Sequence, residues 1–286
     1  MSALRRRIAR LRTVLLLLFV LSVALGLTVS PLPLVADLAV SFSLCALAFV
    51  GPPRADREPV DVDAPVRGRW VAVNSPGTRV PSHGVRSYGQ AYAVDVLHPT
   101  ARGASTRLGW GLRPRPAGAY PTYGEPVRAV ADGVVVAVAD TQRDHRGRDT
   151  WPALVWMLVV EAFFRELGGQ RWILGNHVVV DHGDGVWSAC AHLRRGSVTV
   201  QPGTRVRAGQ VLAQVGNSGN TSEPHLHFQL MDAPAATGAA GLPWRWRGVD
   251  PLDETDPART TGDPKPSAID GVPPNGQVFL AGAVRE

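Results

Sequence analysis

The chain has 286 residues and a mass of 30.5 kDa, enough for one good-sized domain with attachments or for two small domains. Its composition, 45% hydrophobic and 19% charged with two cysteines, excludes a disordered chain and a disulfide-stapled miniprotein, and 30 Gly with 24 Pro favour turn-rich β structure. The net charge is +6, but five of the 30 basic residues and one of the 24 acidic residues precede residue 51. Because the basicity belongs to the N-terminus, we expect no nucleic-acid partner.

Residues 1–50 are predicted to be an N-terminal membrane segment. An arginine-rich start is followed by an apolar stretch over roughly residues 14 to 50, and a single bilayer crossing needs about 20 apolar residues. Ser30–Pro33 interrupts the stretch and would break a continuous helix. Two interpretations stay open: one membrane helix ending near Val29, or a hairpin of two helices with Asp37 in the second.

The two interpretations place the rest of the chain on opposite sides of the membrane. The N-terminal arginines favour a cytoplasmic N-terminus, so one crossing exports the following domain and a hairpin returns it. Arginines after the apolar stretch mildly favour the hairpin.

Residues 51–69 are polar and Pro-rich and are predicted to be a linker. Short β-like runs separated by turn residues then begin, and they predict a mainly β domain over 70–232, built as an antiparallel sheet or sandwich. The eight runs are 70–77, 90–99, 126–140, 176–185, 186–193, 197–203, 204–219 and 224–232.

One segment interrupts the β pattern, at about residues 151–168. Pro152 near its start and Gly168-Gly169 at its end are typical helix punctuation, so we expect a helical insertion. The segment is apolar nearly all round, so it packs on the sheet or touches the bilayer, and we favour packing. Residues 233–286 are rich in Pro, Gly and Asp and are predicted to be an irregular tail.

Histidines and one aspartate carry the candidate chemistry. In Pro224-His225-Leu226-His227-Phe228, a strand would direct both imidazoles to one face while Leu226 and Phe228 enter the core. Asp95 lies in the middle of an apolar run, where a carboxylate is costly unless it is paired or bound to a cation. His192 ends another run. A His/Asp/His set with an open position suits catalytic zinc.

These motifs together resemble the M23 (lysostaphin/LytM-type) zinc metallopeptidases. The resemblance covers residues 80–231 and is most specific in GTRVRAGQVLAQVGNSGNTSEPHLHF, residues 203–228. It implies a lysostaphin-type β domain that holds one Zn²⁺ and cuts stem or cross-bridge peptides of bacterial peptidoglycan. Residue by residue, it makes Asp95 and His227 zinc ligands, with His192 and His225 activating the zinc water and stabilising the oxyanion.

The first zinc ligand departs from the commonest family pattern, H-x-x-x-D. Ala91 stands where that pattern has histidine, and the nearest upstream histidine is His83, twelve residues before Asp95. A subset of the family looks similar, with a histidine upstream of a Q-x-Y-A-x-D strand. We expect His83 to be the third ligand, which requires the Gly84–Gly89 loop to fold back over the strand.

The resulting prediction is a membrane-attached zinc metalloendopeptidase acting on peptidoglycan, at the cell membrane with an extracytoplasmic domain. We favour the extracytoplasmic side because the peptidase-like motifs are stronger evidence than the arginines that flank the apolar stretch. The alternative is a catalytically inactive M23-like domain that binds wall peptides or activates another hydrolase, as family members that have lost ligands do. A lipoyl-type carrier is excluded because no lysine stands at a hairpin tip.

The remaining candidate residues receive no catalytic role. We expect His98 and His145 on surface loops and assign no role to Gln229. His177 and His182 flank an apolar run, and we expect a structural role for His182. Cys190 is interpreted as a packed thiol, and a bridge to Cys45 is implausible because Cys45 lies in the apolar stretch.

Overall fold

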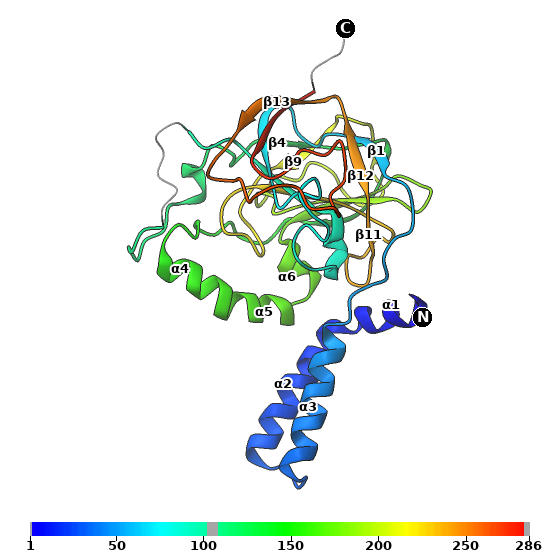
Figure 1. The fold of residues 1–286 in the computed structure, drawn as a ribbon, viewed down its shortest axis with the longest axis vertical. Coiled ribbons are helices and arrows are strands. Elements are labelled where there is room, and N and C mark those ends of the chain that lie inside the picture. The colour runs from blue at the N-terminus through cyan, green and yellow to red at the C-terminus, as the bar shows by residue number, and fades with distance from the viewer. Residues whose placement is uncertain (1, 102–107, 283–286) are drawn as a thin grey trace.

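The computed structural model describes residues 2–101 and 108–282. At its N-terminus, helices α2 (Arg12–Thr28) and α3 (Leu34–Ala48) pack side by side as a hairpin that projects from a β-rich domain (Figure 1). A short helix, α1 (Ser2–Arg10), lies across the base of this hairpin. The turn holds Asp37 by a 2.7 Å hydrogen bond from Ser30 Oγ, and Pro33 directly precedes α3.

In the described residues, no single helix is both long enough and apolar enough to cross a bilayer. Residues 3–10 and 12–28 are long and apolar enough only when they are taken together, and these two helices are bent by 57° where they meet. Helix α3 is a shorter apolar helix.

The domain is mainly antiparallel β-sheet, as predicted. One ten-stranded sheet has the order β13-β14-β2-β3-β10-β7-β6-β5-β8, with β11 paired to β10. Two further pairs lie outside it, β4–β9 (antiparallel) and β1–β12 (parallel). The first strands are β1 (Val60–Asp63), β2 (Gly68–Val73), β3 (Val94–Leu97), β4 (Pro126–Arg128), β5 (Gly133–Ala139), β6 (His177–Asp181) and β7 (Trp187–Ala191). The others are β8 (Arg205–Val206), β9 (Val211–Gln214), β10 (Leu226–Met231), β11 (Gly241–Leu242), β12 (Trp244–Arg247), β13 (Val249–Thr255) and β14 (Gln277–Ala281).

Alternation along the strands divides the large sheet into two different faces. Leu226 and Phe228 of β10 enter the main hydrophobic core, which also takes in residues of β4 and β9 and of β1 and β12. The two small sheets therefore cover one face of the large sheet. The opposite face carries a smaller apolar cluster around Met231 and α6 (Gln170–Leu174), and it is left free for polar side chains.

Two sequence predictions about the edges of the domain are wrong. The supposed linker contains β1 and the start of β2, and the supposed tail supplies β13 and β14, so that β14 pairs with β2 inside the large sheet. Phe279 of β14 is fully buried opposite Trp70, a burial that contributes about 1.5–3 kcal/mol. These short strands were missed because their partners are far away in sequence and polar turns surround them.

Seven of the eight predicted β runs contain a strand. The exception is 197–203, in which Thr199 nevertheless donates its backbone N–H to Leu212 O at 2.9 Å. This backbone hydrogen bond attaches the run to β9, but the run does not form a strand.

Residues 151–167 are helical, in the segment for which the sequence predicts a helix. The helix consists of α4 (Trp151–Trp156), a π-helical turn η3 (Met157–Glu161) and α5 (Ala162–Leu167), and we refer to it as the outer helix. None of its residues is buried, so the favoured interpretation of a helix packed on the sheet is wrong. Apolar residues lie on all sides of this helix. The sequence pattern therefore could not show which face points away from the domain.

Candidate active site

Strand register brings the predicted site residues together. In the antiparallel β3–β10 pair, His227 lies directly opposite Asp95, and its other neighbour across β10 is Ala191, the last residue of β7. His225 precedes β10 on the same face as His227, as the H-x-H spacing predicts. The site therefore sits where three neighbouring strands end on the open face of the sheet.

His83 reaches this site from a loop that folds back on itself. The loop is closed where Ser82 N donates to Ala91 O at 3.1 Å and Ser82 Oγ donates to Ala93 O at 2.6 Å. A 3₁₀ segment, η1 (Ser87–Tyr92), completes the return to β3. The His83 Nε2 atom lies 3.2 Å from each carboxylate oxygen of Asp95.

The hydrogen bonds of His83 determine which of its nitrogens carries hydrogen. The Ser82 hydroxyl hydrogen goes to Ala93 O, so Ser82 Oγ accepts from His83 Nδ1, 3.2 Å away. In the neutral ring, Nε2 then presents a lone pair to Asp95.

The same reasoning applies to His227. The Gln229 side-chain nitrogen donates to Tyr88 O at 2.8 Å, so Gln229 Oε1 faces His227 Nε2 at 2.9 Å and accepts from it. His227 Nδ1 therefore presents its lone pair to Asp95 Oδ1, 2.9 Å away.

Two imidazole lone pairs and a carboxylate thus converge in a site that is largely buried. The candidate ligand atoms of His83, Asp95 and His227 all lie within 4.8 Å of one another. Asp95 is 6% exposed and His227 2%. Buried acceptors that face one another are costly, so this arrangement suits a cation bound between them.

Two residues that support this cluster were not found from the sequence. Gln229, to which no role was assigned, is fully buried and holds the ring of His227. Asn74 donates its side-chain N–H to Asp95 Oδ2 at 2.8 Å and so orients the carboxylate. Gln229 could have been found, because it repeats the two-residue spacing of His225 and His227 on the same face. No sequence signal indicates Asn74, which meets Asp95 through the β2–β3 pairing.

His192 and His225 lie beside the cluster and present their Nε2 atoms. His192 Nδ1 donates to Ser218 O at 2.8 Å, and His225 Nδ1 donates to Glu223 O at 2.8 Å. Since carbonyl oxygens only accept, Nε2 is the proton acceptor in each neutral ring. The His225 Nε2 lies 3.5 Å from Asp95 Oδ1, and the ring centroids of His192 and His225 are 4.9 Å apart.

The electrostatics of the site favour an ionised Asp95 and neutral rings at His83 and His192. Burial opposes the ionisation of Asp95, but the neighbouring His83, His225 and His227 hold its pKa well below the ordinary value. Burial lowers the pKa of His83, although Asp95 opposes the effect. Burial, His225 and His227 together bring the pKa of His192 well below its ordinary value.

The glycine-rich motif of residues 216–219 explains the position of His192. Gly175 and Gly219 both have positive φ, and a Cβ on Gly175 would come within 2.5 Å of the Ser218 backbone. This close approach brings Ser218 O to the His192 ring. His192 itself has a φ of 61°, a left-handed conformation that turns its side chain out of β7 toward the cluster.

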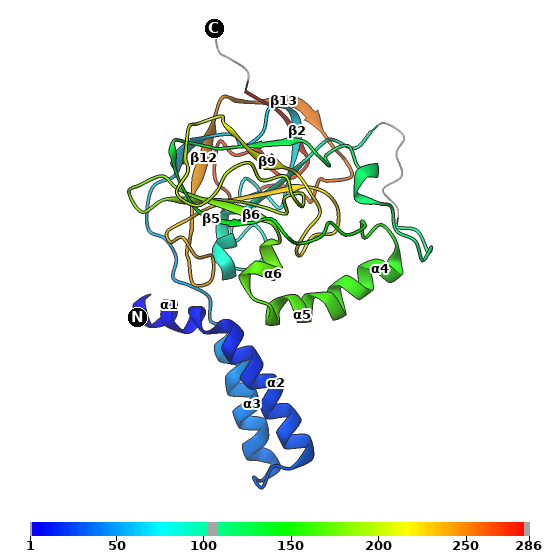
Figure 2. The ribbon, with the colours of Figure 1, turned by 180° about the vertical axis from the view of Figure 1, so that it is seen from behind.

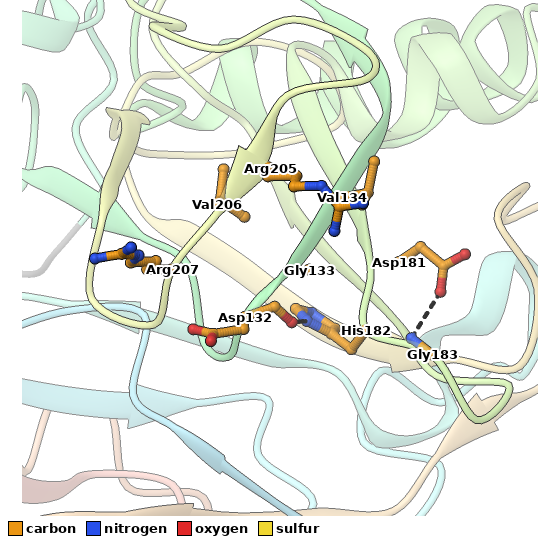
Figure 3. Close-up of a pocket in the computed structure, with 9 residues that line it drawn as sticks. All are labelled: Asp132, Gly133, Val134, Asp181, His182, Gly183, Arg205, Val206 and Arg207. Carbon is orange, nitrogen blue, oxygen red and sulfur yellow. Dashed lines mark hydrogen bonds between the residues drawn. The ribbon is translucent and has the colours of Figure 1, made fainter.

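A cavity of about 330 Å³ opens over these residues. The four histidines and Asp95 line it, and so do Met157 and Glu166 of the outer helix and Arg12 of α2. A hollow of about 500 Å³ lies elsewhere, along the β5–β8 edge (Figure 3). Its histidine, His182, has both ring nitrogens hydrogen-bonded, to Asp132 O and Ser188 Oγ, and so is held in place as a structural residue.

The other histidines lie outside the cluster. His98 stacks on Trp70 with ring centroids 4.6 Å apart, and His177 is buried with Nδ1 bonded to Gly175 O. His145 was predicted on a surface loop but is half-buried, with Nε2 3.0 Å from Gly219 O. Burial raises the pKa of Cys190 to about 12, so this thiol is not a nucleophile.

Residues 159–238 match the profile of peptidase family M23. The chain is 40% identical over 73 residues to the cell division protein DipM of Caulobacter vibrioides, covering 26% of this chain and 12% of that protein. It is 30% identical over 138 residues to the glycyl-glycine endopeptidase ALE-1 of Staphylococcus capitis, covering 44% and 29%.

A third relative is the peptidoglycan DD-endopeptidase ShyA of Vibrio cholerae, 37% identical over 57 residues, with 20% of this chain and 13% of that protein covered. The chain thus spans less than a third of the length of each of these relatives. What is shared is the peptidase region.

Proposed function

We propose that this protein is a membrane-attached zinc metalloendopeptidase that hydrolyses stem or cross-bridge peptide bonds of bacterial peptidoglycan. The observation that carries the proposal is the convergence of His83, Asp95 and His227 on one point, with their acceptor atoms facing one another. The M23 match of residues 159–238 and the similarity to the glycyl-glycine endopeptidase ALE-1 support peptidase chemistry. The similarity to the peptidoglycan DD-endopeptidase ShyA supports a cell-wall substrate.

The donor set suits zinc. Two imidazole nitrogens and one carboxylate make three protein ligands, the number typical of catalytic zinc, and leave a coordination position open to water or substrate. A zinc ion held by His83, Asp95 and His227 would polarise the scissile carbonyl and lower the pKa of a bound water toward about 7.

The chain's own residues then handle the proton. His192 and His225 are fixed by carbonyl acceptors at Nδ1, so either Nε2 can accept a proton from the attacking water and return it to the leaving amine. The second ring, when protonated, can donate to the tetrahedral oxyanion. Because each ring is held by a carbonyl at Nδ1 beside the cluster, either residue can take either role.

Zinc content and hydrolysis together test the proposal. The purified full chain is expected to hold about one zinc and to cleave cross-linked muropeptides, to lose cleavage with a chelator, and to regain it with Zn²⁺. A chain that binds no zinc would contradict the proposal and leave a domain that only binds wall peptides.

Access to peptidoglycan sets the orientation of the protein. Because α2 and α3 form a hairpin, α1 and the β domain lie at the same end of it (Figure 1). The proposed substrate then requires both to be extracytoplasmic, which is the opposite of the side that the N-terminal arginines alone favour. A membrane-impermeant thiol reagent is expected to label a cysteine introduced at exposed Leu112 in whole cells. Labelling only after lysis would place the domain in the cytoplasm and exclude this substrate.

Gln229 is predicted to set the zinc affinity through His227. Gln229→Leu removes the acceptor for His227 Nε2 and is expected to weaken zinc binding about 10–100-fold, the usual effect of losing such a partner. Gln229→Glu keeps an acceptor and should stay closer to the wild type. Competition with a chromophoric chelator measures both, and equal affinity of the leucine variant and the wild type would refute the role.

A further inference from the structure

The outer helix carries its large apolar side chains on the outside. Its exposed residues include two tryptophans and two phenylalanines, and Leu158 and Val159 at its centre are 62% and 66% exposed. The exposed set is Trp151, Val155, Trp156, Leu158, Val159, Phe163 and Phe164. An apolar stripe of this length on a water-soluble surface requires a covering partner.

The charged residues of the same helix point the other way, toward the protein. Glu161 binds Arg148 at 2.7 Å and Arg165 at 3.3 Å, and Glu166 accepts from Tyr88 Oη at 3.0 Å. A helix on the surface of a soluble protein normally buries its apolar face and exposes its charges. The outer helix does the reverse, so its outward face is built for an apolar environment.

Arg12 joins this helix to the apolar hairpin. Its side chain is buried at the junction, where it donates to Glu166 at 2.9 Å and to Ala48 O at 2.8 Å. The guanidinium also lies over the rings of Phe49 and Tyr88. These contacts hold the outer helix against the base of the hairpin, so the exposed apolar surface of one continues into that of the other.

Both views of the fold show the same arrangement. The outer helix and α1 lie at the hairpin end of the domain, on either side of the hairpin and across its direction, whereas the described C-terminal strand ends at the far side (Figures 1 and 2). Helix α2, with 17 residues, is about 25 Å long, most of the thickness of a bilayer core. With the hairpin inserted, the outer helix would lie along the membrane surface.

Helix α1 adds the charge that such a surface needs. Arg6 binds Asp232 of the domain at 2.5 Å, which fixes the helix, while Arg5, Arg7 and Arg10 stay exposed. Arginines are attracted to the negative surface potential of an anionic membrane, and tryptophan side chains favour the headgroup region. Both features match an anionic lipid bilayer.

We propose that the outer helix and α1 form a membrane-interfacial surface on either side of the hairpin, so that the catalytic cavity lies next to the bilayer. Met157 and Glu166 line the cavity from the outer helix, whose opposite face meets the lipid. The cavity is then about one helix diameter, roughly 10–12 Å, from the headgroups. This inference rests on the membrane attachment in the proposed function, and it narrows the substrate to peptides held close to the membrane.

Quenching by lipids tests the surface without any need for activity. The full chain with Cys45→Ser carries an environment-sensitive thiol probe at Leu158→Cys, and it is reconstituted in phosphatidylglycerol–phosphatidylcholine vesicles containing brominated lipid. Cys190 is buried and does not react. Leu280→Cys on β14 is the matched control, since Leu280 is also an exposed leucine. Phe42→Cys, 77% exposed on α3, reports on the hairpin.

The expected result is strong quenching at positions 42 and 158 and little at 280. If position 42 is quenched but positions 158 and 280 are quenched equally weakly, the proposed membrane-interfacial surface is wrong. The hairpin would then still be a membrane anchor. Absence of quenching at 42 would overturn membrane attachment and the surface together. Neither result would bear on the peptidase chemistry, which zinc content and muropeptide cleavage measure separately.

Discussion

A His225→Ala protein is expected to keep its zinc and to hydrolyse peptide about 10²–10⁴-fold more slowly than the wild type. The proposed zinc ligands are His83, Asp95 and His227, and His225 is not among them. Its own ring is held by a hydrogen bond from Nδ1 to Glu223 O at 2.8 Å. The substitution removes the Nε2 acceptor next to the reacting position. It should therefore lower kcat with little change in metal content.

Three measurements make this prediction specific. Zinc stoichiometry, kcat and KM are compared for His225→Ala, His192→Ala and a control, His182→Gln, whose ring lies at the β5–β8 edge. His192→Ala should resemble His225→Ala, because its Nδ1 is likewise fixed by a carbonyl, Ser218 O. The control should retain wild-type kcat. Full hydrolysis by His225→Ala, or loss of its zinc, would contradict the role of His225 in proton transfer and oxyanion stabilisation.

Local patterns predicted those parts of the site that depend on strand geometry. The two-residue spacing of His225 and His227 fixes their common face, and the apolar run around Asp95 makes its carboxylate exceptional in any sheet. Pairing of His227 with Asp95 is a matter of register between strands 132 residues apart, which the sequence pattern alone does not determine. Here the family resemblance supplied what periodicity could not.

The parts that sequence missed depend on distant partners or on direction. Asn74 reaches Asp95 only because β2 pairs with β3, and β14 enters the sheet only because β2 leaves an edge for it. For the outer helix, periodicity could not say which side faces the domain, because apolar residues occupy nearly every position. Its ion pairs, Glu161 with Arg148 and Glu166 with Arg12, decide the direction.

The largest expected effect is that of His83→Ala, which should reduce zinc from about one per chain to a trace and abolish hydrolysis. In the proposed site His83 is one of three protein ligands, and its Nε2 lies 3.2 Å from Asp95. Without it, Asp95 and His227 alone would be left to hold the ion. His83→Cys keeps a zinc donor at the same position and should retain more metal than the alanine variant. Equal loss in both would indicate that the loop has been disturbed.

His83→Ala also tests whether His83 replaces the histidine that the common family pattern has at the position of Ala91. Adding Ala91→His to His83→Ala is not expected to restore zinc, because residue 91 packs against β11. A Cβ built on Gly241 would lie only 3.2 Å from the Ala91 Cβ, and Ala91 is 6% exposed. An imidazole there would have to displace β11 before it could turn toward Asp95. Wild-type zinc in His83→Ala itself would show that the loop histidine is not a ligand, and the enzyme proposal would then lose its third donor.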